Sequence, residues 1–465
     1  MSLTESHARH DWAYRTFSSL DVGSRRRTRR VVAMAAAVAE HPAGAVTDVF
    51  SDSADREGAY RLLSNELVPS AELTRAMCEA TAEDCADFDR VYVPVDGSSL
   101  SLPDGKRGRE VGGLGSWGKG GRGLHCVTAL AIDPKGTPIG VCAQRWWARE
   151  ERSKVDRRSD RTPLEDKETR HLVTTIQDAH ERLEVCASST RAVFVLDRGF
   201  DCWPILQLAG CGVGLILRAE HTRRLVPVQP GDPKYLKDAL GEARVLGHYS
   251  VEVPARDNRP ARIARMEVRA TKVTIELRID RKQREQVTLN AVRAREIGGP
   301  KGASLHWMLL TTEPIDTFAD AIAVVHGYAL RWRIEELHRV WKRGGCDVED
   351  TWLRSREGII KWATLHCAVA TRALRLTHLA RTAPDTPALE EFTQDEIDGA
   401  IVLRRQRTKL KLGATPTVHE VVDMIACLGG YTGKSSGGPP GPTVIARGLE
   451  KIAVAAQVVA SMRGK

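Results

Sequence analysis

Two hydrophobic segments that each lead directly into an aspartate constrain the fold of this chain most strongly. Residues 90–102, RVYVPVDGSSLSL, predict a strand that ends at Asp96 and a turn, and residues 191–201, RAVFVLDRGFD, predict a buried strand that runs into Asp197. Strand ends present side chains to a cleft, so the two carboxylates converge if these strands are neighbours in one sheet. Each aspartate taken alone is more often a simple turn former.

The middle of the chain alternates between strand and helix patterns, which predicts an α/β fold with a mixed sheet. Further strand patterns lie at residues 123–133, 138–147, 213–221 and 304–314, the first two as a meander. Helix patterns lie at residues 163–184 and, as one long helix, at 316–342. Short β-like segments between about residues 220 and 304 predict a β-rich insertion.

Both ends of the chain have helical patterns, which predicts three domains. The first 85 or so residues contain several helix patterns, one of them opening with Ser53 or Asp55 as its cap. Beyond residue 360 the chain is helical again, interrupted by the Gly/Pro-rich loop 429–442. We therefore expect a helical N-terminal domain at residues 1–85, a central domain at 86–370 with the insertion at about 220–304, and a helical C-terminal domain at 371–465.

Composition argues against several classes of protein. With 465 residues, 42% of them apolar, the chain can fill several cores, but no apolar run reaches the roughly 18 residues of a membrane span. Residues 1–12 lack the apolar core of a signal peptide, so a cytosolic protein is expected. Ten scattered cysteines without a C-x-x-C pair argue against structural zinc and a disulfide framework, and for small core residues.

The chain is basic, with a formal net charge of +9 and a pI near 9.1, which suggests a polyanionic partner. Residues 24–30, SRRRTRR, hold five arginines in seven positions. Such a cluster is either a solvated surface or a set of phosphate contacts, and its density favours phosphate contacts. A dense stretch of mixed charge follows at residues 151–171.

The segment 328–342, YALRWRIEELHRVWK, carries two adjacent carboxylates among cations and indoles. On a continuous helix, offsets of three, four and seven residues return to one side. One stripe then holds Tyr328, Arg331, Glu335 and Lys342, with Trp332 and Arg339 beside it. The opposite side can face a core and holds Leu330, Ile334, Leu337 and Trp341. The stripe is either a solvated face of an amphipathic helix or the wall of a site.

Three acids from these segments form a set suited to metal ions. Asp96 and Asp197 come from strand ends, and Glu335 comes from the helix after the insertion. Clustered carboxylates would repel and raise one another's pKa, so their clustering makes sense chiefly with Mg²⁺ or Mn²⁺ bound. Two such ions, about 3.5–4 Å apart, could activate water or a 3′-hydroxyl and stabilise the leaving oxygen at phosphorus. The expected chemistry is phosphoryl transfer.

At these residues the chain resembles a known family, the cut-and-paste bacterial DDE transposases of the IS-four group, closest to the Tn-five type. The specific element is the signature Y-x2-R-x3-E-x6-K, which is matched by Tyr328, Arg331, Glu335 and Lys342. The aspartate motifs DGSSLSL and VLDRGFD, the helix segment DREGAYRLL, the pair Trp146-Trp147 and the segment WMLLT extend the similarity over most of the chain.

The resemblance implies a ribonuclease H-like catalytic core with a β insertion, a helical N-terminal DNA-binding domain and a C-terminal dimerisation domain. It implies that Asp96, Asp197 and Glu335 bind two Mg²⁺ ions, with Mn²⁺ as a possible substitute. Contacts to DNA near the cleaved end are implied for Tyr328, Arg331 and Lys342, with Arg339 among the cations beside them. Contacts to the terminal inverted repeat are implied for Arg26, Arg27 and Arg30.

Trp307 stands 21 residues before Tyr328, the spacing of a family tryptophan that stacks on a base flipped from the transposon end. The alternative is an ordinary core indole on a strand. Two departures from the family pattern stand near the aspartates. Pro94 lies in what should be a central strand and predicts a local bulge. Gly199 replaces a glutamate that relatives have after Asp-Arg.

The function implied by the resemblance is DNA transposition in the bacterial cytoplasm, at the nucleoid when DNA is bound. The protein would bind terminal inverted repeats of double-stranded DNA, pair two ends as a homodimer, and cleave them by metal-dependent hydrolysis. The freed 3′-OH would then form a hairpin that water opens before joining to target DNA, and no membrane takes part. Two alternatives stay open: a metal-dependent nuclease on the same core, and a catalytically silent DNA-binding protein derived from a transposase.

Overall fold

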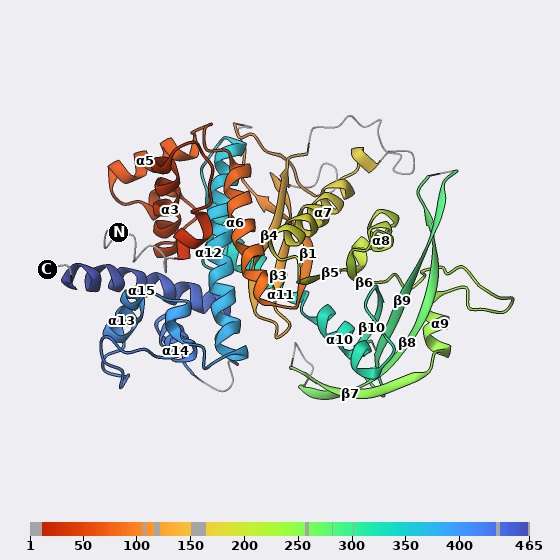
Figure 1. The fold of residues 1–465 in the computed structure, drawn as a ribbon. Helices are drawn as coiled ribbons and strands as arrows, with labels where there is room; N and C mark the ends of the chain where they lie inside the picture. The colour runs from red at the N-terminus through yellow and green to blue at the C-terminus, as the bar shows by residue number, and fades with distance from the viewer. Residues whose placement is uncertain are drawn as a thin grey trace. The chain divides into compact units, whose positions relative to one another are not determined.

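The computed structural model describes most of the chain, namely residues 12–105, 108–115, 121–149, 164–255, 260–280, 282–300, 302–433 and 438–463. The N-terminal segment 1–11, most of the mixed-charge stretch, and residues 434–437 of the Gly/Pro-rich loop lie outside these ranges. The chain divides into two compact units (Figure 1). The first unit comprises Met1–Phe88, Gly97–Ser189 and Arg333–Lys465, and the second comprises Asp89–Asp96 and Thr190–Trp332.

The N-terminal part of the first unit is helical, as predicted. Its helices are α2 (Trp12–Phe17), α3 (Arg25–Glu40), α4 (Val46–Val49), α5 (Ser53–Leu63) and α6 (Ser70–Asp84). The predicted N-cap of α5 was wrong, because neither Ser53 nor Asp55 is the N-cap residue. Asp52 caps the helix, and its Oδ1 accepts hydrogen bonds from the backbone N–H groups of Ala54 at 2.8 Å and Asp55 at 3.1 Å. A carboxylate at this position satisfies N–H groups that the first helical turn leaves unpaired.

A single long helix, α12 (Arg356–Thr382), fastens this N-terminal part by buried polar bonds. The fully buried Trp362 donates from Nε1 to the carbonyl of Gly44 at 2.7 Å. Lys361, only 1% exposed, donates from Nζ to the carbonyls of Leu63 at 3.0 Å and Asn65 at 2.9 Å. Buried polar groups are costly without partners, so these bonds hold α12 in one position against α4 and α5. No described helix, α12 included, is both long and apolar enough to cross a membrane.

The C-terminal part of the first unit is also helical, as predicted, with α13 (Gln394–Leu403), α14 (Val418–Leu428) and α15 (Pro442–Arg463). Two of these helices approach at backbone distance, because a Cβ atom on Gly448 of α15 would lie 2.0 Å from the carbonyl oxygen of Ile425 on α14. The last turn of α15 is tied down as well. Arg463 forms an ion pair with Asp398 of α13, a carboxylate with 0% exposure.

The β part of the first unit is the predicted meander. Strand β3 (Arg122–Ile132) pairs antiparallel with β4 (Pro138–Trp147) and with the short β2 (Gly112–Gly113). Helix α7 (Thr169–Cys186) covers these strands, and its Arg182 donates from Nη1 to the carbonyl of Cys142 at 2.6 Å. Six of the ten cysteines are buried, so the prediction that the cysteines are core residues is confirmed for these six only. These are Cys78, Cys85, Cys126, Cys142, Cys346 and Cys367.

The second unit contains a mixed sheet with strand order β1-β5-β6-β10-β9-β8-β7. Strands β1, β5 and β6 run parallel, and the strands from β10 onward pair antiparallel. The strands are β1 (Arg90–Ser101), β5 (Arg191–Leu196), β6 (Gly214–Arg218), β7 (Val245–Val253), β8 (Arg262–Arg278), β9 (Arg284–Glu296) and β10 (His306–Thr311). The unit's helices are α8 (Trp203–Gly210), α9 (Leu236–Glu242) and α10 (Phe318–Ala329). A mixed α/β architecture is thereby confirmed.

Three predictions about strands were wrong. The segments of the β-rich region are long, because β8 is a 17-residue strand paired along its length with β9. Strand β1 continues through Asp96 as far as Ser101, so no turn follows the aspartate. The bulge predicted at Pro94 is absent from the β1–β5 pair, whose register runs to Pro94 opposite Val195 without a shift. A proline removes only one N–H donor from the ladder, and the flanking residues keep this register.

The predicted long helix 316–342 is two helices, α10 and α11 (Trp332–Arg343). The chain breaks between them at Leu330 and Arg331, where the N–H of Arg331 bonds to the carbonyl of Tyr328 at 3.1 Å in a tighter turn. The continuous stripe of the sequence prediction was therefore wrong. Its opposite side was right, because all four residues predicted to face the core are buried: Leu330, Ile334, Leu337 and Trp341.

Candidate active site

Two parallel strands of the second unit carry the two predicted aspartates at matching positions. Pro94 of β1 lies opposite Val195 of β5, and Asp96 and Asp197 each follow two residues later. Neighbouring strands lie about 4.8 Å apart, so this register brings the two carboxylates to the same edge of the sheet. The sequence predicted that the carboxylates converge if these two strands are neighbours, and β1 and β5 are neighbours.

Asp197 is held in place by two hydrogen bonds. It precedes a short 3₁₀ turn, η4 (Arg198–Phe200), and its Oδ1 accepts from the backbone N–H of Arg198 at 2.7 Å. The same oxygen accepts from the hydroxyl of Tyr328, on α10, at 3.3 Å. Side-chain oxygens that accept from their own turn are well oriented before any ligand binds. Asp197 is therefore a fixed acceptor at the edge of the sheet.

Tyr328 is buried, with 5% exposure, and its ring meets the edge of Trp307 at a centroid distance of 5.9 Å. Burial raises the pKa of Tyr328, and the charge of Asp197 raises it further against the opposing effects of Arg218 and Arg331. The hydroxyl therefore keeps its proton and donates a hydrogen bond to Asp197. Trp307, on β10, is half-buried, so part of its indole remains accessible.

Asp96 faces a cation from the break between α10 and α11. Nη1 of Arg331 lies 3.7 Å from Oδ2 of Asp96, and the Arg331 side chain is only 11% exposed. A guanidinium this close lowers the repulsion between two neighbouring carboxylates. The second unit thus brings together Asp96, Asp197, Tyr328, Arg331 and Trp307, five of the residues predicted from the sequence.

Glu335 lies in the first turn of α11, within the first unit. Its meeting with the two aspartates stays a prediction. The adjacent Glu336 has a different role, because its Oε2 lies 2.9 Å from Nε2 of His378 and 3.3 Å from Nη1 of Arg333. Burial acts to raise the pKa of Glu336, but the His378 and Arg333 contacts outweigh it and lower the pKa. Glu336 therefore anchors α11 to α12.

The chemistry of the two aspartates suits a divalent cation, since carboxylate oxygens are the ligands that Mg²⁺ and Mn²⁺ prefer. Within the described ranges, no group of three or more His, Cys, Asp and Glu side chains is arranged to hold a metal ion. The aspartate pair on β1 and β5 is the pair of predicted metal ligands that lies within the second unit.

The remaining predicted DNA contacts lie in the first unit. Arg26 is exposed on α3, whereas Arg27 donates from Nη1 to the carbonyl of Val22 at 2.8 Å. Arg30 lies against α5, because a Cβ atom on Gly58 would fall 1.6 Å from its Nη2. On α11, Arg339 is exposed and Lys342 is half-buried. Of the three N-terminal arginines, Arg26 and Arg30 are thus exposed, and Arg27 is half-buried.

His338 was missed from the sequence, although it follows Glu335 by one helical turn. Its ring packs near Trp341 at a centroid distance of 6.3 Å, and its buried Nε2 has no hydrogen-bond partner among the described residues. Burial lowers the pKa of His338 to about 3, with a smaller contribution from Lys342. The only sequence signal was a histidine three residues after a glutamate on a helix.

The neutral His338 ring, whose Nε2 is buried, predicts a loss of stability in acid. The unfolded chain binds the proton near pH 6.5 and the folded chain only near pH 3, so the free energy of unfolding should fall as pH drops through this window. Replacing His338 by methionine should flatten this slope by up to about 1.4 kcal/mol per pH unit. Urea unfolding of both proteins at pH 7.5, 6, 5 and 4 measures how the free energy of unfolding depends on pH. An unchanged slope would mean that His338 is already protonated, or exposed, in the folded state.

Comparison with known families gives two matches, one near each end of the chain. Residues 9–68 match a family model described as transposase DNA-binding, and residues 368–464 match one described as the transposase Tn5 dimerisation domain. The first match covers α2 to α5, and the second covers most of α12 together with α13, α14 and α15. The candidate site lies between these two stretches of sequence.

Proposed function

We propose that this chain, which its two family matches support as a Tn5-type transposase, cuts its element out of DNA by metal-dependent phosphoryl transfer and joins the freed 3′-OH ends to target DNA. The observation that carries the proposal is the pair Asp96 and Asp197 at matching positions of two neighbouring strands. Tyr328 contacts Asp197, and Arg331 contacts Asp96. Tyr328 and Arg331 are the first two residues of the Y-x2-R-x3-E-x6-K signature. That both contact an aspartate supports assigning the third, Glu335, to the same chemistry.

In this proposal Asp96, Asp197 and Glu335 hold two divalent cations. When bound, such ions supply Lewis-acid activation of the attacking oxygen and charge stabilisation of the leaving oxygen. The residues around them have separate tasks. Tyr328 keeps Asp197 oriented through its hydroxyl, and Arg331 offers a guanidinium that can meet a phosphate oxygen beside Asp96.

Trp307 has a place in the hairpin step of the proposal. Its indole is half-buried and rests edge-on against Tyr328, the tyrosine that holds Asp197. A base stacked on its accessible part would lie close to the carboxylates. Replacement of Trp307 by alanine should therefore weaken hairpin formation more than the first nick, and equal loss of both steps would indicate an ordinary core residue.

The proposal is tested by incubating the full-length protein with the DNA that flanks its own element, with and without Mg²⁺. The positions of the cuts are then mapped. We expect nicks at the element ends only with the divalent ion present, and joined products when pre-cut ends meet a supercoiled target. Cleavage without joining would indicate a nuclease. Binding to the ends without any cleavage would indicate a silent DNA-binding descendant.

A second copy of the chain is the partner that the dimerisation match supports. Helix α15 packs one apolar side on the rest of the first unit. It leaves uncovered a stripe of three apolar residues that are spaced four residues apart. The stripe consists of Val454, Val458 and Met462, with exposures of 45%, 54% and 74%. Spacing by four residues keeps the three on one side of the helix, so the stripe can pack against an equivalent helix.

Placing a charge in this stripe should weaken the dimer. The change Val458→Asp is expected to raise the dimer dissociation constant about 30-fold or more, because a carboxylate would be buried without a partner. Sedimentation of the protein bound to end DNA measures it. The matched control is Val185→Asp on α7, a valine with 83% exposure outside the stripe. Equal effects of both changes would remove the stripe from the interface.

A further inference from the structure

Trp352 is an exposed aromatic side chain that nothing in the proposed chemistry uses. It lies in the loop before α12 and is 79% exposed, more than any other large aromatic residue in the described part of the chain. Indoles carry the largest apolar surface of any side chain and usually bury most of it. An indole held in solvent is therefore a candidate contact for a partner.

The loop that carries Trp352 is held in one conformation by bonds on both sides of the indole. Before it, the carbonyl of Thr351 accepts from Nη2 of Arg109 at 2.7 Å. After it, the carbonyl of Arg354 accepts from the N–H of Glu110 at 3.0 Å, and the N–H of Arg356 donates to Oε2 of Glu110 at 2.9 Å. A partner that binds the indole does not have to order this loop first, which lowers the entropic cost of binding.

The same loop borders the helix α5 of the matched DNA-binding region. An open groove of about 510 Å³ lies between them. From α5 it is lined by Arg56, Tyr60 and Arg61, with Glu57 forming an ion pair with Arg61, and from the loop and the start of α12 by Leu353, Ser355 and Gly358. The matched region ends at residue 68, so the groove extends its surface onto residues that the family model does not cover.

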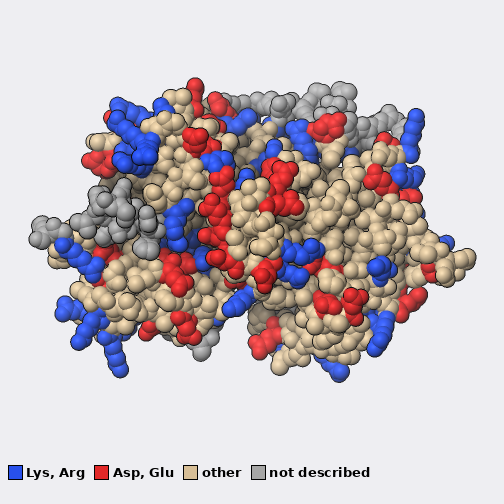
Figure 2. Space-filling view, in the orientation of Figure 1, with Lys and Arg blue, Asp and Glu red and all other residues tan. Residues whose placement is uncertain are grey.

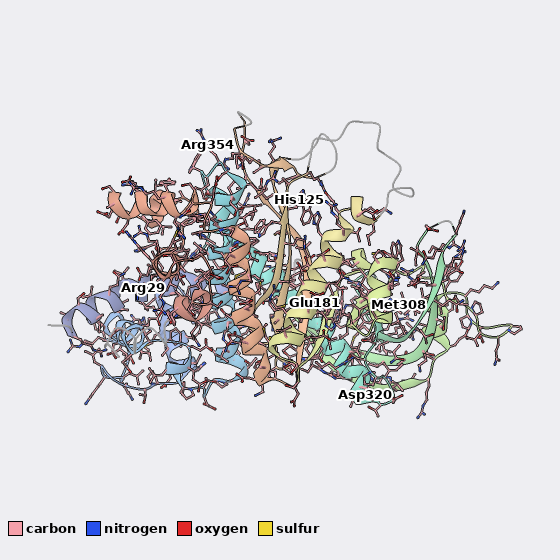
Figure 3. All side chains as sticks on the ribbon, turned by 45° about the horizontal axis from the view of Figure 1, so that its top comes forward. Arg29, His125, Glu181, Met308, Asp320 and Arg354 are labelled. Carbon is pink, nitrogen blue, oxygen red and sulfur yellow. The ribbon has the colours of Figure 1, made fainter. Side chains whose placement is uncertain are left out.

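The charges around this groove suit a polyanion. Figure 2 shows Lys and Arg side chains gathered over the α3 and α5 region of the face in view. Arg354 projects from the loop (Figure 3), and it and Arg356 are both exposed. Tyr60 in the groove is 41% exposed. Cations interleaved with exposed aromatic rings are the pattern of a surface that binds phosphates and stacks on nucleotides.

We propose that the DNA-binding surface of this protein continues from α5 across the groove to Trp352, where the indole stacks on a nucleotide while Arg354 contacts a phosphate. The inference rests on the proposed function, because it takes the bound polyanion to be the element's end DNA. It adds a contact outside the matched DNA-binding region.

Binding to labelled end duplexes in EDTA tests the proposal without requiring cleavage. Trp352→Ala should weaken binding by roughly 5- to 150-fold, the range for loss of one stacked base, while Trp352→Phe should stay within about threefold of the wild type. Arg354→Gln should reduce the slope of log affinity against log salt by about one, and Arg405→Gln, an equal charge loss on an exposed arginine after α13, should leave the slope unchanged.

Photocrosslinking identifies the contact directly. A set of end duplexes, each with one 5-iodouracil at a different position, should include at least one that crosslinks to the peptide containing Trp352, and Trp352→Ala should abolish that crosslink. Affinity within twofold of wild type for Trp352→Ala, with no crosslink in residues 349–356, would overturn the proposal. A change in dimerisation without a change in DNA affinity would overturn it as well.

The failure of this inference is distinguishable from failure of the proposed function. Wild-type protein is assayed in parallel for Mg²⁺-dependent nicking of the same duplexes. If the wild type binds and nicks the end DNA and the Trp352 variants bind and nick it equally well, only the proposed extension of the DNA-binding surface is refuted. If the wild type neither binds nor nicks the end DNA, the transposition proposal fails first.

Discussion

Replacing Glu335 by glutamine is expected to abolish metal-dependent nicking of end DNA while leaving the binding of that DNA unchanged. Glutamine keeps the shape and the polar surface of the side chain but removes the negative charge that a divalent cation requires. Loss of one charged ligand from a two-metal site should cost several kcal/mol of transition-state stabilisation, a rate loss of about a thousandfold or more. Single-turnover nicking of a labelled duplex with Mg²⁺ measures it.

The chain provides a matched control one residue away. Glu336→Gln makes the same chemical change on the same helix, but Glu336 bonds to His378 and Arg333. That variant should lose stability, by about 1–3 kcal/mol, and keep most of its nicking rate at a temperature where it is folded. Retained nicking by Glu335→Gln would falsify the assignment of Glu335 as a metal ligand. If Glu336→Gln lost nicking instead, the catalytic glutamate would be the second of the pair.

Replacing Trp362 by alanine is expected to cost about 3–5 kcal/mol of the free energy of unfolding. The side chain is fully buried on α12, and its removal leaves a large cavity together with an unpaired carbonyl at Gly44. The α4 and α5 segment should loosen first, because Gly44 loses its bond to α12. Urea unfolding measures the global loss, and amide exchange near Gly44 reports the local one.

Two comparisons separate packing from hydrogen bonding at this position. Trp362→Phe keeps most of the ring volume and loses the bond to Gly44, so its cost should be smaller, at about 1–3 kcal/mol. Trp352→Ala removes an indole that is 79% exposed and should change stability by less than about 0.5 kcal/mol. If Trp362→Ala were as mild as Trp352→Ala, the docking of α12 would not depend on this residue.

The sequence predicted those features that depend on local pattern. The strand 138–147 and the strand 191–196 were placed to within a residue because each is mostly apolar and borders a turn residue at one end. The expectation that Asp96 and Asp197 converge was conditional on their strands being neighbours, and the β1–β5 pairing meets that condition. The buried side of α11 followed from its period, since Ile334, Leu337 and Trp341 recur at helical spacing.

Features set by distant contacts escaped prediction. No glycine or proline marks the break at Leu330 and Arg331, where Arg331 faces Asp96, a residue more than 200 positions earlier in the chain. The contact that Glu336 makes depends on His378, which lies on another helix. Arg27 was expected to contact DNA because of the family resemblance, and its bond to the carbonyl of Val22 is not encoded in any motif.

The length and the contacts of helix α12 limit which N-terminal regions can be exchanged between this protein and its relatives. Its first turns bond to the DNA-binding region through Lys361 and Trp362, and from residue 368 onward it belongs to the dimerisation match. At 27 residues it is a rod of about 40 Å, in which one inserted residue would rotate one end against the other by about 100°. Grafting a foreign N-terminal region onto this chain therefore requires the matching half of α12, and recombination between homologues should preserve the helix as a block.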